Sequence, residues 1–109
     1  MAWLLRDGEV LASLEVAETR RRRRQGLLRR DGLEGALLLL PAKSVHTIGM
    51  RFPIDVAWCD AELRVLRTAR MVPHRVSRPV AHAHSVIEAE AGCFAHWNLL
   101  AGDQLERKD

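Results

Sequence analysis

Residues 53–60 read Pro-Ile-Asp-Val-Ala-Trp-Cys-Asp, and this short segment decides how the chain folds. Successive side chains of a strand point to opposite faces of a sheet. One face would carry Ile54, Val56 and Trp58, and the other would carry Asp55, Ala57 and Cys59. Because both faces are mostly apolar, and because a proline and an acidic turn bound the run, we expect a buried strand over residues 54–59.

Other short segments, each ended by turn residues, lie on both sides of this strand. The two-residue turn Asp7-Gly8 is a strong hairpin signal near the start of the chain. Besides residues 54–59, we expect strands over residues 2–6, 9–14, 36–40, 63–72, 85–91 and 104–106. Residues 73–83, which contain prolines and histidines, indicate an irregular loop.

Only two segments indicate helices. Thr19 can cap a short helix that runs to about Leu28. Residues 93–100 predict a second helix, whose core-facing side chains would be Phe94, Trp97 and Leu100. Many short strands with one or two short helices predict a mainly β (α+β) fold, a compact antiparallel β-sandwich or barrel-like domain. A length of 109 residues fits one domain, spanning residues 1–109.

The composition is that of an ordinary globular protein, with 48% hydrophobic and 28% charged residues, which argues against a disordered chain. Apolar runs such as Ala36–Leu40 are far shorter than the roughly 20 residues of a membrane span. The apolar start of the chain is too short for a secretory signal, so we expect a cytoplasmic protein. We expect the two cysteines, Cys59 and Cys93, to be reduced and buried.

Positive charge is concentrated in one stretch. The net charge is +3, yet seven arginines lie between Arg20 and Arg30, so the rest of the chain is mildly acidic. We interpret Arg20–Arg24 as part of a solvated helix. A weak nucleic-acid or anionic-surface binder that uses Arg20–Arg24 is an alternative. Nucleic acid is the less favoured partner, because no aromatic side chain that could stack on bases lies nearby.

The order of several short motifs is similar to that of a known family. The motifs are Arg24-Gln25-Gly26-Leu27-Leu28-Arg29-Arg30, Leu33, Gly35, Pro53-Ile54-Asp55-Val56, Val86-Ile87-Glu88, Ala91-Gly92 and Gly102-Asp103. This ordered set resembles the domain of unknown function 192 family over about residues 14–105. The resemblance implies a β-sandwich-like fold. It implies no reaction, because no activity is established for the family and a fold alone does not supply one.

Residues 46–50, His-Thr-Ile-Gly-Met, depart from the segment aromatic-Trp-Met-x-Asn-Thr that many members of that family carry before their Pro-x-Asp. Any role of that Trp or Asn cannot be transferred to this chain. The glycine within the segment permits a close approach of the backbone to a ligand. We therefore take residues 44–60 as the best candidate site. The ligand-binding candidates are His46, Thr47, Met50 and Asp55.

The function that we expect from residues 44–60 is binding. The chain would be a non-catalytic module that holds an unknown protein or small-molecule partner, and no cofactor is predicted. The alternative is a small hydrolase-like enzyme that uses His46 or Asp55, since either side chain can act as a general base. No serine or cysteine nucleophile stands at a recognisable turn, so no catalytic residue is assigned.

Two carboxylates, Asp55 and Glu88, stand among apolar residues, where an unpaired charge is costly. We expect Asp55 to accept backbone N–H groups from the preceding loop or to pair with an arginine. For Glu88 the expected partners are Arg24 and Arg30, in a structural ion pair that joins the first helix to the sheet.

Two loose groups of metal-ligating side chains remain. His82 and His84 are separated by one residue, with His74 upstream, and Cys93 lies three residues before His96. Neither group has the tight paired spacing of a zinc site. We predict no metal site and interpret His74, His82 and His84 as solvated loop residues.

Overall fold

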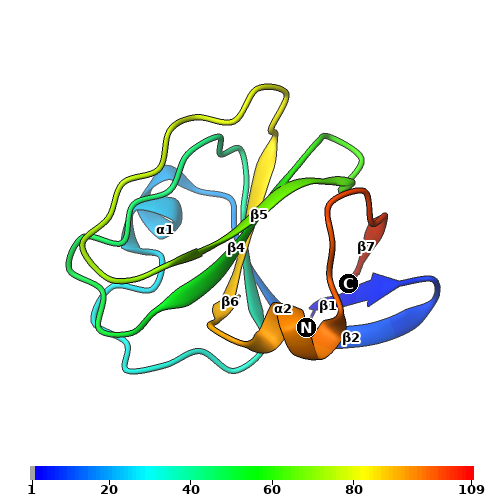
Figure 1. Ribbon diagram of the computed structural model, residues 1–109, viewed down its shortest axis with the longest axis horizontal. Coiled ribbons are helices and arrows are strands. Elements are labelled where there is room, and N and C mark those ends of the chain that lie inside the picture. Colours follow the sequence, from blue (N-terminus) through cyan, green and yellow to red (C-terminus); the bar gives the residue numbers. More distant parts are fainter. Residues whose placement is uncertain (1) are drawn as a thin grey trace.

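A single curled sheet dominates the computed structural model, which describes residues 2–109 (Figure 1). In that part of the chain the strands are β1 (Ala2–Arg6), β2 (Glu9–Ala17), β3 (Ala36–Leu39), β4 (Ile54–Cys59), β5 (Val65–Met71), β6 (Ser85–Glu90) and β7 (Leu105–Lys108). Their order across the sheet is β5-β4-β6-β3-β2-β1-β7. The predicted mainly β class is confirmed. All neighbouring strands are antiparallel except β2 and β3, which run parallel.

The strand predicted over residues 54–59 is confirmed as β4, and all six of its residues are buried. It lies between β5 and β6, and a core packs on each of its faces. Ala57 and Cys59 belong to one core, whereas Ile54, Val56 and Trp58 belong to the other. The alternation expected from the sequence therefore divides the molecule into two apolar cores on opposite faces of one sheet.

The two edges of the sheet meet at one end and turn the curl into a half-barrel. Arg64, just before β5, forms a β-bridge with Gln104, just before β7. The amide of Val65 donates to the carbonyl of Asp103 at 2.9 Å, and the amide of Leu105 donates to the carbonyl of Leu63 at 3.0 Å. These bonds use backbone groups that an open sheet edge would leave unpaired.

The arginine-rich helix, α1 (Arg20–Gln25), begins at Thr19, whose side chain accepts a hydrogen bond from the amide of Arg22. Its last residue is Gln25, three residues earlier than the sequence predicted, and Gly26 forms its C-cap. The φ angle of Gly26 is 44°, a left-handed conformation that glycine adopts without steric cost. The turn that follows buries Leu27 in the core that contains Val56.

The second helix, α2 (Cys93–Trp97), is also shorter than predicted. Asn98 ends it with a left-handed φ of 53°. The chain therefore changes direction before Leu100, which is 60% exposed, whereas Leu99 is 5% exposed and packs in the core with Phe94. The prediction that Leu100 faces the core is wrong because it extended the helical spacing past this cap.

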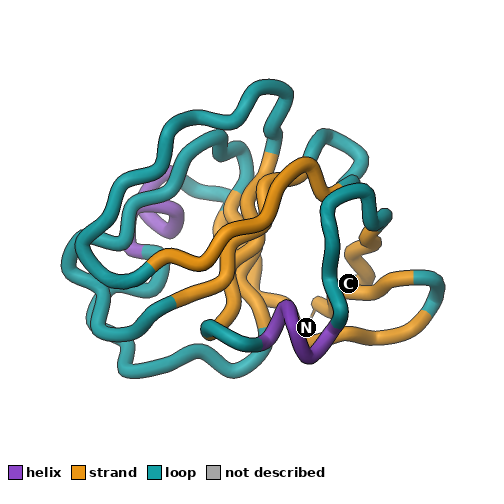
Figure 2. The backbone as a smooth tube through the Cα atoms, in the orientation of Figure 1, coloured by secondary structure: helices purple, strands orange, loops and turns teal. Residues whose placement is uncertain are grey.

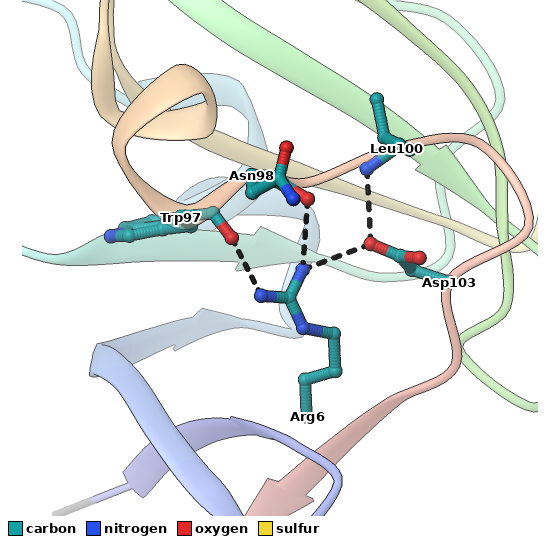
Figure 3. Close-up of polar contacts among 5 residues, drawn as sticks. All are labelled: Arg6, Trp97, Asn98, Leu100 and Asp103. Atoms are coloured by element: carbon teal, nitrogen blue, oxygen red, sulfur yellow. Dashed lines mark hydrogen bonds and ion pairs between the residues drawn. The ribbon is translucent and has the colours of Figure 1, made fainter.

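One arginine joins β1 to the end of α2 (Figure 3). The guanidinium of Arg6 donates to the carbonyls of Trp97 at 2.6 Å and Asn98 at 3.1 Å, and it binds the carboxylate of Asp103 at 2.9 Å. Asp103 in turn accepts from the amide of Leu100 at 3.0 Å. A positive charge at a helix C-terminus satisfies carbonyls that have no partner within the helix.

Loops gather on the side of the sheet where α1 lies, opposite α2 (Figure 2). Two of them, residues 41–53 and 72–84, run side by side and are joined by a β-bridge between His46 and Val76. Neither helix of residues 2–109 has the length and apolar character that crossing a membrane would require.

Candidate functional site

A pocket with a volume of about 80 Å³ lies between α1, the loop that follows β3, and the sheet. The turn after α1 contributes Leu27 and Leu28, and β6 contributes Val86 and Glu88. We call this cavity the Glu88 pocket. The loops and α1 that form the pocket cover an apolar core that the sheet alone would expose.

Glu88 gives the pocket its chemical character. Glu88 is only 4% exposed, and within residues 2–109 no hydrogen bond or ion pair engages its carboxyl group. The residues opposite it on the neighbouring strands, Leu37 and Val56, are apolar. Burial raises the pKa of Glu88 to about 7, because an apolar surrounding disfavours the charged form. Near neutral pH this carboxyl group can therefore donate or accept a hydrogen bond.

The ion pair expected for Glu88 is not formed. Arg30 instead binds Glu15 of β2 through two hydrogen bonds, of 2.9 and 3.0 Å. Arg24 is exposed and lines the Glu88 pocket, but no ion pair of the described chain joins it to Glu88. Arg30 therefore contacts β2, on the other side of β3 from the strand that carries Glu88.

Three of the predicted site residues lie within the segment 44–50. His46 and Met50 line the Glu88 pocket, His46 from an exposed position and Met50 from a buried one. Thr47 is fully buried and points elsewhere. Its Oγ1 donates to the carbonyl of Val72 at 2.7 Å and accepts from the amide of Arg75 at 2.9 Å. Thr47 thus fastens this segment to the neighbouring loop.

Asp55 lies on the opposite face of the sheet from the Glu88 pocket. Its Oδ2 accepts from the amides of Gly92 at 2.9 Å and Phe94 at 3.1 Å, and its Oδ1 lies 3.2 Å from Nε of Arg70. The sequence suggested backbone donors from the loop before β4, but the donors belong to the start of α2. The contact with Arg70 is of the kind that the sequence suggested as the alternative. The carboxylate holds the first turn of α2 against β4.

The groups weighed as metal ligands do not assemble a site. Within residues 2–109, no three histidine, cysteine, aspartate or glutamate side chains lie together in a way that could hold a metal ion. Cys59 and Cys93 are free thiols, the first buried and the second partly exposed.

The turn after α1 is the part of the site that sequence reasoning missed. The sequence predicts that the first helix continues to about Leu28 and that Arg24 and Arg30 pair with Glu88, whereas Gly26, Leu27 and Leu28 form a wall of the pocket. The sequence did mark both sides of the pocket, because the motif at 24–30 and the motif at 86–88 belong to the ordered set on which the family resemblance rests. The structure brings these two motifs together at the Glu88 pocket.

Comparisons with known proteins agree on the fold. A crystal structure of a protein of unknown function from Novosphingobium aromaticivorans DSM 12444 matches with a TM-score of 0.81 and 22% identity, over 96% of this chain and 82% of that one. A crystal structure of a "putative transcription regulator" from Sinorhizobium meliloti 1021 matches with a TM-score of 0.80 and 21% identity, over 97% of this chain and 91% of that one. At such identities the likeness shows a shared fold.

No curated protein sequence matches the chain. The model of the DUF192 family, described as an uncharacterized ACR, matches residues 2–107. This match covers both motifs that meet at the Glu88 pocket. The chain therefore belongs to the DUF192 family.

Proposed function

We propose that this protein is a binding domain that holds the end of a small polar molecule in the Glu88 pocket. The observation that carries the proposal is the Glu88 carboxyl group, which is buried, lines a pocket and has no partner within residues 2–109. Within residues 2–109 the fully buried side-chain atoms without a partner are Nε1 of Trp58 and Oγ of Ser85, so the Glu88 oxygens open into the pocket, where a ligand can reach them. A ligand that donates a hydrogen bond would offset the cost of holding this group away from bulk water.

The other residues of the pocket indicate the class of ligand. Met50, Leu28 and Val86 offer apolar contacts, whereas Arg24 and His46 are exposed beside them. A terminal amine or hydroxyl group would meet Glu88, and a polar or anionic portion would remain near Arg24 and His46. A volume of about 80 Å³ accommodates a few non-hydrogen atoms, so only one end of a larger molecule would enter.

Binding is better supported than hydrolysis by His46 or Asp55. The two side chains lie on opposite sides of the sheet, since His46 lines the Glu88 pocket and Asp55 belongs with the start of α2. Asp55 is already engaged by two backbone amides and Arg70. Because the two residues do not share a pocket, each would have to act alone, and a general base needs a lone pair that is free to reach the substrate.

A titration followed by ¹H–¹⁵N NMR tests the proposal. The probes are ethanolamine, glycine, glycerol and methylammonium, each added at millimolar concentration. We expect at least one probe to shift the amide signals of residues 24–28, 44–50 and 86–88, and the carboxyl ¹³C signal of Glu88. The variant Glu88→Gln keeps the shape of the side chain and removes its charge, so it should change the affinity.

Glu106→Gln is the matched control, because Glu106 is an exposed glutamate on β7. Its titration should reproduce that of the native protein. The proposal is contradicted if none of the probes moves the signals of the pocket, or if Glu88→Gln binds every probe as the native protein does.

A further inference from the structure

A second pocket, of about 270 Å³, lies where β4 and β5 face the loop after β5. Three arginines line it, Arg67 from β5 and Arg75 and Arg78 from the loop, and Trp58 of β4 contributes an aromatic wall. We call it the arginine pocket. It shares no lining residue with the Glu88 pocket, so an inference about it is independent of the proposed function.

The charge of the arginine pocket is unbalanced. No carboxylate is among its lining residues. Within residues 2–109, no ion pair engages Arg67, Arg75 or Arg78, although other arginines, such as Arg6 and Arg30, are paired with acidic residues. All three arginines are exposed, so their charges are accessible to an anion from solution.

The first of the three arginines is held by packing. Arg67 lies directly opposite Trp58 in the pairing of β4 with β5. Its guanidinium group lies 6.0 Å from the centre of the Trp58 ring, at the outer limit of a cation–π contact. Trp58 is buried, so the ring gives the guanidinium a fixed support. An arginine that is already oriented loses less side-chain entropy when it binds.

The backbone that carries the other two arginines is fixed by hydrogen bonds, and Nη1 of Arg75 donates to the carbonyl of His74 at 3.3 Å. Thr47 bonds both the amide and the carbonyl of Arg75, the latter through its own amide at 2.8 Å. Next to Arg78, the amide of Ser77 donates to the carbonyl of Val45 at 2.8 Å, and the Oγ of Ser77 accepts from the amide of Val45 at 2.8 Å. The loop that carries these arginines is thus fixed to the 45–47 segment.

We propose that the arginine pocket binds the phosphate group of a small phosphomonoester. A guanidinium group presents a planar set of N–H donors that matches the oxygens of a phosphate. Three such groups around one concavity suit a single dianionic phosphate. A nucleic-acid strand would need a longer basic track with exposed stacking partners, whereas the only aromatic residue of this pocket is buried.

Isothermal titration calorimetry in a chloride buffer tests this inference. The probes are inorganic phosphate, glycerol 3-phosphate and a single-stranded oligonucleotide. We expect both phosphate probes to bind, more weakly as the ionic strength rises. Glycerol 3-phosphate should bind at least as tightly as inorganic phosphate. Arg67→Gln, Arg75→Gln and Arg78→Gln should each weaken binding about tenfold, the loss expected when one charge-assisted hydrogen bond is removed.

Arg64→Gln is the matched control, because Arg64 is an exposed arginine near the start of β5 that lies outside the pocket. It should leave the affinity unchanged. The NMR spectrum of each variant checks that it is folded, and Arg67→Lys, which keeps the charge, should bind more tightly than Arg67→Gln. The inference is overturned if neither phosphate probe binds, if Arg64→Gln weakens binding as much as the pocket variants, or if the oligonucleotide binds more tightly than both phosphates.

Discussion

Arg30 binds the carboxylate of Glu15 through two hydrogen bonds, of 2.9 and 3.0 Å, and it forms no ion pair with Glu88. The partners are 35% and 42% exposed, so solvent screens their attraction and the pair contributes about 1 kcal/mol or less. Arg30 also holds the pKa of Glu15 below its usual value. The pair fastens the turn after α1 to β2. The buried carboxyl group of Glu88 on β6 remains available to the pocket.

The stability of the protein should depend on the titration of Glu88. Its pKa in the folded protein is about 7, compared with 4.5 for an exposed glutamate. The folded state therefore binds more protons than the unfolded state between these values, and the free energy of unfolding falls as the pH rises through this window. In Glu88→Gln the part of this dependence that comes from Glu88 should disappear. Relative to the native protein, the variant should gain roughly 3 kcal/mol between pH 4 and pH 8.

Urea unfolding at several pH values measures this difference, with Glu106→Gln as the control, because Glu106 is exposed on β7. The control should follow the native protein at every pH. A Glu88→Gln variant whose stability relative to the native protein does not change with pH would show that burial does not perturb this carboxyl group.

Removal of the Asp55 carboxylate should be strongly destabilising. Asp55→Ala leaves the amides of Gly92 and Phe94 without their acceptor, at a cost of roughly 2–5 kcal/mol. Arg70 is 58% exposed, so Arg70→Ala should cost about 1 kcal/mol or less. Thermal or chemical unfolding of the two variants separates these effects. Equal losses would mean that the ion pair, and not the support of α2, is the main contribution of Asp55.

The hydroxyl group of Thr47 should matter more than its methyl group. Thr47→Val preserves the shape of the side chain but removes its bonds to Val72 and Arg75, which should cost about 1–3 kcal/mol. Thr47→Ser keeps the hydroxyl group and should cost only about 1 kcal/mol, the value of one buried methyl group. If Thr47→Val is the more stable of the two variants, the hydrogen bonds between the loops contribute little.

The two cysteines should differ in their reactivity toward iodoacetamide. Burial and the nearby Asp60 raise the pKa of Cys59 to about 12, and the side chain is inaccessible. Burial also raises the pKa of Cys93, but this residue is partly exposed. Because the thiolate is the reactive form, we expect slow labelling of Cys93 and none of Cys59 until the protein is unfolded. Mass spectrometry of tryptic peptides after native and denatured labelling distinguishes the two sites.

Strand β4 could be predicted from the sequence because its signal is local. The alternation of its faces and its bounding residues all lie within residues 53–60, and the structure reproduces its ends. The end of α1 was also marked locally, by Gly26, although the sequence-based prediction continued the helix to Leu28. Where the hydrogen-bonding pattern of a few neighbouring residues decides the conformation, the chain reveals it.

The candidate site could be predicted only in part. The segment 44–50 was identified, and His46 and Met50 do line the Glu88 pocket. The expected pairing of Arg30 with Glu88 is wrong, because the curl of the sheet, which the sequence does not show, places Arg30 beside Glu15. The parallel pairing of β2 with β3 has the same origin, since it brings together segments separated by α1 and a long turn. Contacts between distant segments follow from the tertiary arrangement and not from local preference.

The pairing of β1 with β7 has a mechanical consequence. Trp3 lies directly opposite Lys108, so the outer ends of these two strands are adjacent (Figure 1). Hydrogen bonds in an antiparallel pair run perpendicular to the strands. A pulling force applied between Trp3 and Lys108 therefore acts along these bonds and separates them one pair after another, beginning at the loaded end. The fold should yield at a low force in this direction, even though the same strands would resist being slid past each other.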